Sequence, residues 1–290
     1  MQPSKTVVRL SALIVVLVLV AAGTGLFWHP PGETFTFTTL RGETAEIYGR
    51  GLYYYDTIFA AAGYRAVDLT LLAFGLPALI ACTLLYRRGS LRGGLLLTAV
   101  LAYFLYAYVS YAFGAAYNRL FLVYVALFSL VFFAFVITFT SIDLRSLTST
   151  VLADLPRTGP AIFMIVAGVA TSVIWLAPLI GSMLQDRPPD LLYSYTTMVT
   201  DALDVALITP LSLLSGILIL RRKPLGYRIA FPLLGIILLL IPQIILGTLF
   251  QLRAGVEYSP GEIVGPISGF VILGLFAIWV TLAILRKMPD

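Results

Sequence analysis

The chain has almost none of the side chains on which redox and metal chemistry depend. Its 290 residues include one cysteine, Cys82, and one histidine, His29. A lone cysteine forms neither an intramolecular disulfide nor a dithiol relay, which excludes thiol–disulfide oxidoreductases. One histidine outside the apolar segments supports neither bis-histidine haem ligation nor a histidine-based metal site within a membrane. We therefore expect no cofactor and no bound metal.

Charged residues and nucleotide motifs are also scarce. Lys, Arg, Asp and Glu make up 11% of the chain, and no lysine falls within a long apolar segment, which excludes a retinal Schiff base. The sequence has no Walker phosphate-binding loop and no dinucleotide-binding glycine fingerprint, so it does not encode nucleotide-driven pumping. Carboxylates, hydroxyls and amides remain as the groups that could support a function.

Apolar residues dominate instead. They make up 60% of the chain, and the mean hydropathy is +0.97, whereas about half apolar is usual for a soluble domain. Lipid offers no partner for free backbone groups, and no segment alternates as a barrel strand does, so the spans are expected to be helices. The sequence predicts an all-α integral membrane protein, a single transmembrane domain over residues 1–290 built as an eight-helix bundle. The expected spans are residues 7–27, 58–86, 94–113, 120–140, 160–180, 201–220, 227–250 and 263–285.

The distribution of basic residues predicts the orientation. By the positive-inside rule, the side that carries most Lys and Arg is cytoplasmic, which indicates a plasma (inner) membrane protein with both termini inside. The net charge of +5 then reflects topology and contact with the lipid bilayer rather than a nucleic-acid partner. Thirteen of the nineteen basic residues lie on this side: Lys5, Arg9, Arg87, Arg88, Arg92, Arg145, Arg157, Arg221, Arg222, Lys223, Arg228, Arg286 and Lys287. The other face holds six arginines, mostly near acidic residues in the sequence: Arg41, Arg50, Arg65, Arg119, Arg187 and Arg253.

The first apolar segment has an alternative interpretation as a cleaved signal peptide. Lys5 and Arg9 would form its positive region, and residues 20–23 its small-residue end. Against this, the apolar run continues to Trp28 and has no clear A-x-A cleavage site.

Residues 29–57 are predicted to form an extracytoplasmic β-hairpin inserted between the first two spans. Residues 34–38 alternate as a strand does, a turn follows at residues 41–43, and residues 45–48 suit a second strand. Three consecutive tyrosines at residues 53–55 are typical of an aromatic belt at the lipid headgroups. The hairpin either anchors the chain at the interface or acts as a lid over an outer opening.

The two halves of the chain show signs of an internal repeat. Residues 28–31 and 186–189 both end in a proline pair, and each precedes tyrosines, an acidic residue, a proline within a span and an inner arginine pair. The acidic residues matched in this way are Asp68 and Asp204, and the prolines are Pro77 and Pro210. Four spans per unit would make the halves parallel, with the hairpin as an insertion in the first half. Chance likeness is the alternative, because proline pairs and basic loops recur in unrelated membrane proteins.

Three acidic residues lie at a shared depth. At a rise of about 1.5 Å per residue, Asp68, Asp201 and Asp204 fall close to the outer edge of a hydrocarbon core about 30 Å thick. They are either carboxylates at helix starts, stabilised by the helix dipole, or a cluster that binds a proton or cation. Asp201 and Asp204 are three residues apart and share a helix face, as a cluster requires.

The third and seventh spans add polar groups at the same level. Tyr103, Tyr106, Ser110, Gly114 and Tyr117 recur at steps of three and four and form one stripe, which Asn118 follows. Pro232 and Pro242 are expected to kink the seventh span beside Gln243 and to free backbone carbonyls. Polar glue between helices is the plainer interpretation. The predicted pocket residues are Asp68, Tyr106, Ser110, Asn118, Asp201, Asp204 and Gln243.

Three stretches carry a resemblance to known sequences. YFLYAYVSYAFGAAYNRLFLVYVALFSL (residues 103–130), YGRGLYYYD (residues 48–56) and RRGSLRG (residues 87–93) are similar to a family of prokaryotic multi-pass integral membrane proteins with no known activity. The resemblance covers roughly the first half of the chain. It implies a membrane location and assigns no residue a role.

Three functions fit these features. The first is a secondary transporter or permease for a small solute, in which a carboxylate of an outward-facing pocket takes up a proton or cation. The second is an intramembrane enzyme acting on a lipid or prenyl phosphate, with a divalent ion on Asp201 and Asp204; the DALD string is similar to the D-x-x-D of membrane prenyltransferases, but the rest of their motifs is missing. The third is a non-catalytic accessory subunit whose hairpin binds a partner. We favour the first, and more generally a protein that is not an enzyme.

Overall fold

The computed structural model describes residues 2–142 and 153–288. Most of this chain is helical, and within it eight helical segments are long and apolar enough to cross a membrane. The segments are α1 (Lys5–Phe27), α2 (Ile58–Thr70) continuing through a π-helical turn η1 (Leu71–Gly75) into α3 (Leu76–Arg87), α4 (Leu91–Gly114), α5 (Phe121–Ser141), α7 (Thr158–Leu184), α8 (Val199–Leu203) continuing through a π-helical turn η4 (Asp204–Ile208) into α9 (Thr209–Leu220), α10 (Pro224–Arg253) and α11 (Pro260–Leu285). Each overlaps one predicted span, which confirms a multi-pass helical protein. Arg145, one of the basic residues counted above, lies outside the described residues.

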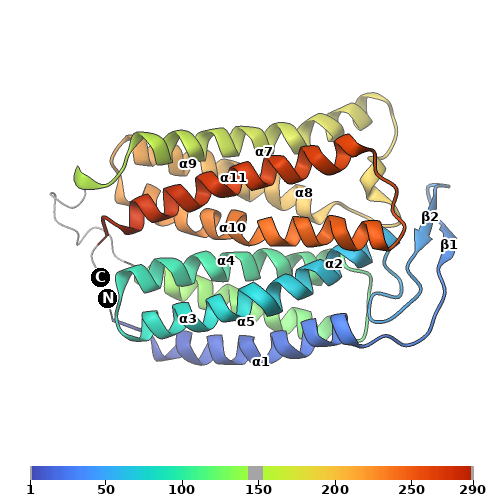
Figure 1. Ribbon diagram of the computed structural model, residues 1–290, viewed down its shortest axis with the longest axis horizontal. Helices are drawn as coiled ribbons and strands as arrows, with labels where there is room; N and C mark the ends of the chain where they lie inside the picture. The colour runs from blue at the N-terminus through green and yellow to red at the C-terminus, as the bar shows by residue number, and fades with distance from the viewer. Residues whose placement is uncertain (1, 143–152, 289–290) are drawn as a thin grey trace.

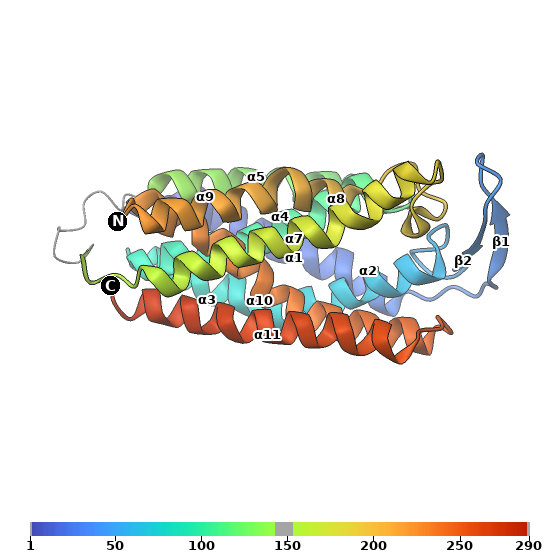
Figure 2. The same cartoon turned by 90° about the horizontal axis from the view of Figure 1, so that it is seen from above.

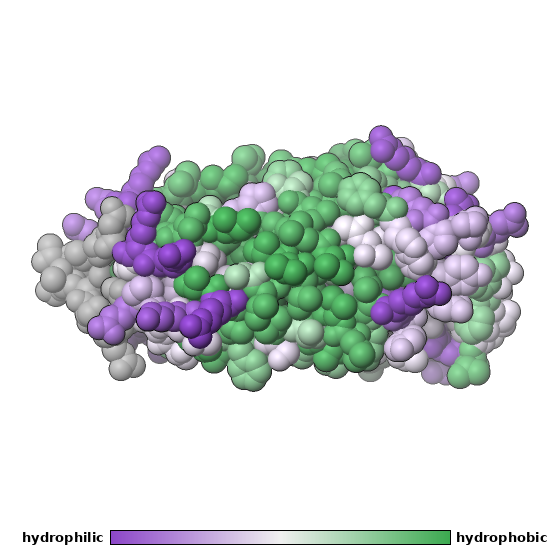
Figure 3. Space-filling view, turned by 90° about the horizontal axis from the view of Figure 1, so that it is seen from below, coloured by the Kyte–Doolittle hydropathy of each residue, from purple (hydrophilic) through white to green (hydrophobic). Residues whose placement is uncertain are grey.

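The helices lie side by side along one long axis (Figures 1 and 2). The two strands, β1 (Phe35–Thr38) and β2 (Thr44–Ile47), project from one end of the bundle, and both chain termini lie at the opposite end (Figure 1). We refer to these as the hairpin end and the termini end. Apolar side chains cover the middle of the face in Figure 3, and hydrophilic side chains gather at its two ends. Such a band suits a protein surrounded by lipid, since soluble monomers rarely expose large continuous apolar surfaces.

The predicted hairpin is present. β1 and β2 pair antiparallel, with Phe35 opposite Ile47 and Thr38 opposite Thr44. Gly42 adopts a φ of 84° in the connecting turn, a conformation that a residue with a Cβ rarely adopts. A further bridge joins Ile47 to Thr57, the residue whose side chain caps the start of α2 by accepting from the Ala60 amide at 3.2 Å. The hairpin is therefore tied directly to the second span.

The helices form two groups that meet at α4 and α10. In the first group α1 packs on α2, α3 and α5, and α4 packs on α3 and α5; in the second, α9 packs on α7 and α10, and α11 packs on α10 and α7. Between the groups, α10 packs on both α2 and α4. Gly235 of α10 lies so close to α4 that a Cβ there would overlap the backbone of Ala99. The span that α1 forms is part of the first group's packing.

The second and sixth spans break their α-helical hydrogen bonding in the same way. Each has an aspartate, Asp68 or Asp201, followed three residues later by a five-residue π-helical turn. A proline then follows near the start of the next helix: Pro77 at nine residues from Asp68, and Pro210 at nine from Asp201. Proline lacks the backbone donor and crowds the preceding turn, so a π-helical turn before it relieves the mismatch. This register pairs Asp68 with Asp201 and not with Asp204, the residue matched from sequence.

The same offset continues beyond the breaks. α3 and α9 begin 133 residues apart, at Leu76 and Thr209, and both are 12 residues long. Two residues past their ends, Gly89 and Arg222 have φ values of 80° and 53°. The third span then begins at Leu91 and the seventh at Pro224, again 133 residues apart.

The seventh span, α10, is a single α-helix that contains Pro232 and Pro242, and no change of helix type occurs beside Gln243. The breaks are η1 and η4, in the second and sixth spans.

Candidate functional site

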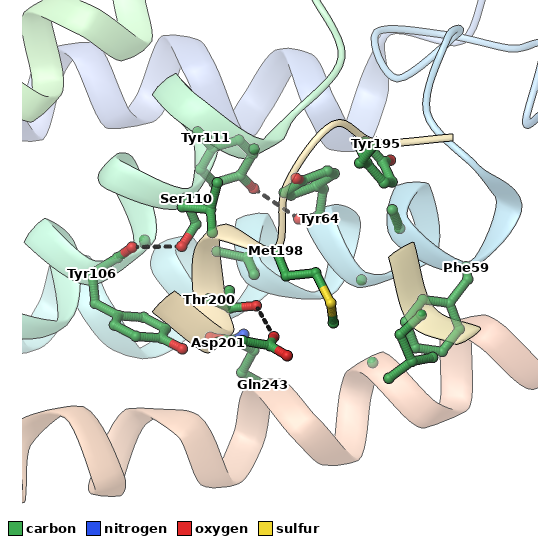
Figure 4. Close-up of a pocket in the computed structure, with 18 of the residues that line it drawn as sticks. Phe59, Tyr64, Tyr106, Ser110, Tyr111, Tyr195, Met198, Thr200, Asp201 and Gln243 are labelled. Atoms are coloured by element: carbon green, nitrogen blue, oxygen red, sulfur yellow. Dashed lines mark hydrogen bonds between the residues drawn. The ribbon is translucent and has the colours of Figure 1, made fainter. Parts of the chain in front are cut away.

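A cavity of about 400 Å³ lies between the two helix groups toward the hairpin end. α2, α4, α8 and α10 form its walls, and the loop that joins α7 to α8 covers part of it (Figure 4). The loop contributes Tyr193, Tyr195, Thr197 and Met198 to the lining. The size is within the range of about 300–1,000 Å³ that is typical of small-molecule sites.

The walls combine aromatic rings with a few polar groups. Phe59, Tyr64, Tyr106, Tyr111 and Trp175 supply rings. Asp201 is the one charged residue among the described residues that line the cavity. It is 5% exposed, and the Thr200 hydroxyl is 3.3 Å from its Oδ1 as a donor (Figure 4). A cavity with a single carboxylate and aromatic walls suits a neutral or cationic guest and disfavours an anion.

Four of the seven predicted pocket residues line this cavity: Tyr106, Ser110, Asp201 and Gln243. The Ser110 hydroxyl donates to the Tyr106 carbonyl oxygen at 2.9 Å, and Gln243 Oε1 accepts from the Tyr103 hydroxyl at 2.8 Å. Of the predicted stripe, Gly114 also lines the cavity, whereas Tyr103 is buried and Tyr117 is 77% exposed. The middle of the α4 stripe therefore faces the cavity, and its end leaves the bundle.

Asp68 lies behind the cavity wall. Its carboxylate is 2% exposed and accepts hydrogen bonds from the Tyr53 hydroxyl at 2.6 Å and the Tyr111 hydroxyl at 2.9 Å. Gly25 of α1 packs against it, where a Cβ would overlap Asp68 Oδ2. The Tyr111 hydroxyl is also 2.9 Å from the Tyr64 carbonyl oxygen, and its single proton can serve only one acceptor fully. Since Tyr111 lines the cavity, one phenol separates Asp68 from it.

Asp204 and Asn118 do not line the cavity, contrary to the prediction. Asp204 opens η4, is half-buried, and interacts with the side chains of Tyr106 and Trp175. Asn118 Oδ1 accepts from the Leu120 amide at 2.9 Å and so fixes the turn that leads into α5. An amide at a helix start commonly serves its own backbone, which local spacing alone does not distinguish from a binding role.

The loop over the cavity is held by the hairpin. Arg41, between the two strands, donates from Nη2 to the carbonyl oxygens of Tyr193 at 2.7 Å and Tyr195 at 3.3 Å. This contact joins residues more than 150 positions apart, and the sequence contains no signal of it. The hairpin thus contacts a segment that lines the cavity, as the interpretation of the hairpin as a lid requires.

Asp56, which the sequence analysis did not single out, holds the same loop from the other side. Its Oδ1 accepts from the Tyr195 hydroxyl and from the Ala116 amide, both at 2.8 Å, while its buried Oδ2 has no partner among the described residues. Asp56 precedes the second span. Burial raises the pKa of its carboxyl from 3.8 to about 7, although the two hydrogen bonds oppose this shift. A buried carboxyl of this kind changes charge near neutral pH.

The cavity lining is matched across the two helix groups. Seven pairs of lining residues are separated by the offset of 133 that relates η1 to η4. The pairs are Ala60 and Tyr193, Tyr64 and Thr197, Val67 and Thr200, Ala107 and Leu240, Ser110 and Gln243, Tyr111 and Ile244, and Gly114 and Gly247. In five of these pairs both residues lie in helices, whereas Tyr193 and Thr197 belong to the loop before α8, so the shared register holds for the helical walls of the cavity.

Comparison with known proteins identifies no relative of this chain. No family model, no curated protein and no solved structure matches the chain.

Proposed function

We propose that the protein is a secondary transporter or permease for a small neutral or cationic solute, which binds in the cavity beside Asp201. The observation that carries the proposal is the matched lining, because solute sites in transporters built from repeats lie where the repeats meet. Seven of the pairs that line this cavity keep one offset of 133 residues. A cavity at such an interface changes shape when the two halves move against each other.

The proposal includes two parallel four-helix repeats, α1–α5 and α7–α11. The π-helical turns, the prolines after them and the starts of α4 and α10 all keep the offset of 133. The proline pairs before these spans differ: Pro188 follows Pro30 by 158 residues, 25 more than the offset. The first half thus holds about one hairpin's length of extra chain, as expected if β1 and β2 are an insertion. Four spans per half make the repeats parallel, related by an axis along the membrane normal.

Asp201 supplies the coupling group in this proposal. It is the charged group of the described lining, so a cationic solute or a proton compensates its charge when the cavity closes. Asp68 holds the matching position in the first half, but Tyr53 and Tyr111 occupy its oxygens. We infer that one half keeps a carboxylate for the solute, while the other uses its carboxylate to fasten helices.

The proposed orientation places the hairpin end outside the cell. The basic connectors at the termini end are cytoplasmic by the positive-inside rule, so the cavity opens toward the exterior. In this orientation the hairpin and the loop over the cavity form an outer lid.

The enzyme alternative receives less support from the geometry. Binding a divalent ion between Asp201 and Asp204 requires both carboxylates at one site; the two interact electrostatically, but Asp204 is engaged by Tyr106 and Trp175 and is not among the lining residues. The described residues contain no group of three or more His, Cys, Asp or Glu side chains placed to hold a metal. The accessory-subunit alternative assigns the hairpin to a partner, whereas Arg41 uses its Nη2 on the protein's own loop.

Uptake into proteoliposomes tests the proposal. A panel of amino acids, amines and sugars is screened first for thermal stabilisation of the purified protein, and the compounds that bind are then tested for transport. Asp201→Asn should abolish uptake, and Gly247→Leu should block it by filling the cavity, because the nearest atom to a Cβ at Gly247 is 3.9 Å away. Asp154→Asn, an exposed residue at the termini end, and Gly181→Leu, with no atom within 4 Å of its Cβ position, are the matched controls. Uptake that survives both cavity variants contradicts the proposal.

A further inference from the structure

A second cavity, of about 380 Å³, lies at the hairpin end on another face of α2. Its lining includes Arg50 after the hairpin, Arg65 of α2 and Arg253 at the end of α10. No acidic residue is among the described residues that line it. None of these three arginines is within 4.0 Å of a carboxylate in an ion pair in the part of the chain that the structure describes, whereas Arg41 pairs with Glu43 and Arg187 with Asp190.

The Arg65 guanidinium is held by neighbouring side chains, but not all of its N–H donors have a hydrogen-bond partner. Its Nη1 donates to the Tyr48 hydroxyl at 3.3 Å, its Nη2 is 3.4 Å from His29 Nε2, and its guanidinium lies 5.6 Å from the Phe250 ring centroid. Its buried Nε has no hydrogen-bond partner among the described residues. Asp68, three residues further along α2, attracts Arg65 electrostatically, but its oxygens accept from Tyr53 and Tyr111. A buried, unpartnered donor in an uncompensated basic cavity requires an acceptor.

We propose that this cavity binds a phosphate-bearing anion, which Arg50, Arg65 and Arg253 hold together. Three guanidinium groups around one cavity match the several oxygens of a phosphate, which arginine binds through two parallel N–H groups. The anion supplies the negative charge that the described lining of this cavity lacks. The site is independent of the proposed transport cavity, whose described lining contains Asp201 and no basic residue.

Two sources can supply this chemistry: an anionic lipid headgroup or a soluble phosphate compound. The cavity lies where α2 begins and α10 ends, and Ile58, Ala62 and Phe250 give it an apolar side. A lipid offers both a phosphate for the arginines and acyl chains for such a side. The soluble source lacks the second contact.

The test uses the full chain in uncharged detergent at fixed ionic strength. Thermal stability and binding are measured with phosphatidylglycerol, with phosphatidylcholine as the uncharged lipid, and with glycerol 3-phosphate and inorganic phosphate as soluble probes. Phosphatidylglycerol should stabilise the protein and phosphatidylcholine should not. If glycerol 3-phosphate stabilises it equally well, the site stands and its source is soluble.

Variants connect the response to the three arginines. Arg50→Gln/Arg253→Gln should weaken binding by about a hundredfold, tenfold for each charge-assisted contact. These two residues are exposed, so the variant is expected to fold, and Arg187→Gln, another exposed arginine of the same end, should bind as the unaltered protein does. Equal stabilisation by phosphatidylcholine, no response to any probe, or unchanged binding by the double variant would overturn the proposal.

Discussion

Tyr53 donates a 2.6 Å hydrogen bond to Asp68 Oδ2 and so fastens the segment before α2 to a carboxylate buried against α1. Removing this hydroxyl leaves a charge-bearing acceptor buried without one of its partners. We expect Tyr53→Phe to lower the free energy of unfolding by about 1–3 kcal/mol, the usual cost of an unsatisfied buried group. Tyr55→Phe, at a side chain that is 63% exposed, should cause little change. The two variants are compared by thermal unfolding in detergent. Equal stabilities would show that the Tyr53–Asp68 hydrogen bond contributes little to the stability of the fold.

Asp56 should make stability depend on pH. Its pKa is raised from 3.8 to about 7, so the folded state holds a proton that the unfolded chain releases. The contribution is fully present below pH 3.8, declines as pH rises to about 7, and is absent above that. From the shift, its upper limit is about 4 kcal/mol. The other titratable groups that interact with it are Tyr64, Tyr124 and Tyr195.

Asp56→Asn tests this dependence, because asparagine keeps an acceptor for Tyr195 and Ala116 but does not ionise. Between pH 4 and pH 8 the unaltered protein should lose stability relative to the variant, with most of the difference appearing by pH 7. Melting temperatures of both proteins across this range give the measurement. Parallel curves would mean that Asp56 keeps one protonation state throughout.

Two glycines of α10 should respond differently to the same change. A Cβ at Gly235 would overlap the backbone of Ala99, whereas a Cβ at Gly247 would be 3.9 Å from the nearest atom, Ala66 Cβ. Gly235→Ala should therefore destabilise the protein by about 1–3 kcal/mol or more, since neither helix can yield locally. Gly247→Ala should be neutral or slightly stabilising, since alanine is the better helix former. Similar losses in both variants would contradict the close approach of α4 and α10.

Arg41 should control access to the cavity. Ser110→Cys in a Cys82→Ala background places one thiol in the cavity wall, and a membrane-impermeant maleimide should label it from outside the cell. Adding Arg41→Ala frees the carbonyls of Tyr193 and Tyr195. Labelling should then accelerate about fivefold, because an exposed charged hydrogen bond contributes about 1 kcal/mol.

Glu46→Ala is the control for this experiment. Glu46 lies on β2 and, among the described residues, forms no hydrogen bond or ion pair with the loop over the cavity. An unchanged rate with Arg41→Ala would show that the hairpin does not hold the loop closed. Labelling that requires permeabilised cells would reverse the proposed orientation.

The spans and the hairpin could be predicted because their signals are local. Long apolar runs and a two-residue alternation depend on neighbouring residues, and both gave the correct elements. The prolines were harder to interpret. Pro232 and Pro242 lie in a continuous α10, whereas the helix departs from α-geometry before Pro77 and Pro210. Tertiary packing, which the sequence does not display, decides how each missing hydrogen bond is accommodated.

The site could be predicted only in part, for the same reason. Tyr106, Ser110, Asp201 and Gln243 line the candidate cavity, as expected for polar groups in apolar spans, which must face protein or water. Asn118 lies outside the cavity lining, because its side-chain oxygen accepts from the Leu120 amide in the turn before α5. The contacts of Arg41 with the loop and of Asp56 with Tyr195 join distant parts of the chain, so no local sequence pattern predicts them. The offset of 133 residues relates the two π-helical turns, which begin at Leu71 and Asp204.

The single carboxylate in the described lining of the cavity limits the electrical driving force that the proposed transporter gains from a membrane potential. With Asp201 as the charged group of the described lining, one turnover with a neutral solute moves at most a single proton or monovalent ion. Each elementary charge gains about 2.3 kcal/mol per 100 mV. At that potential the electrical driving force alone sustains an accumulation of roughly fiftyfold. A steeper gradient needs a second ionisable group that changes charge in the same cycle, and the neighbouring carboxylates, Asp68 and Asp204, each interact with a tyrosine of the cavity wall and do not line the cavity.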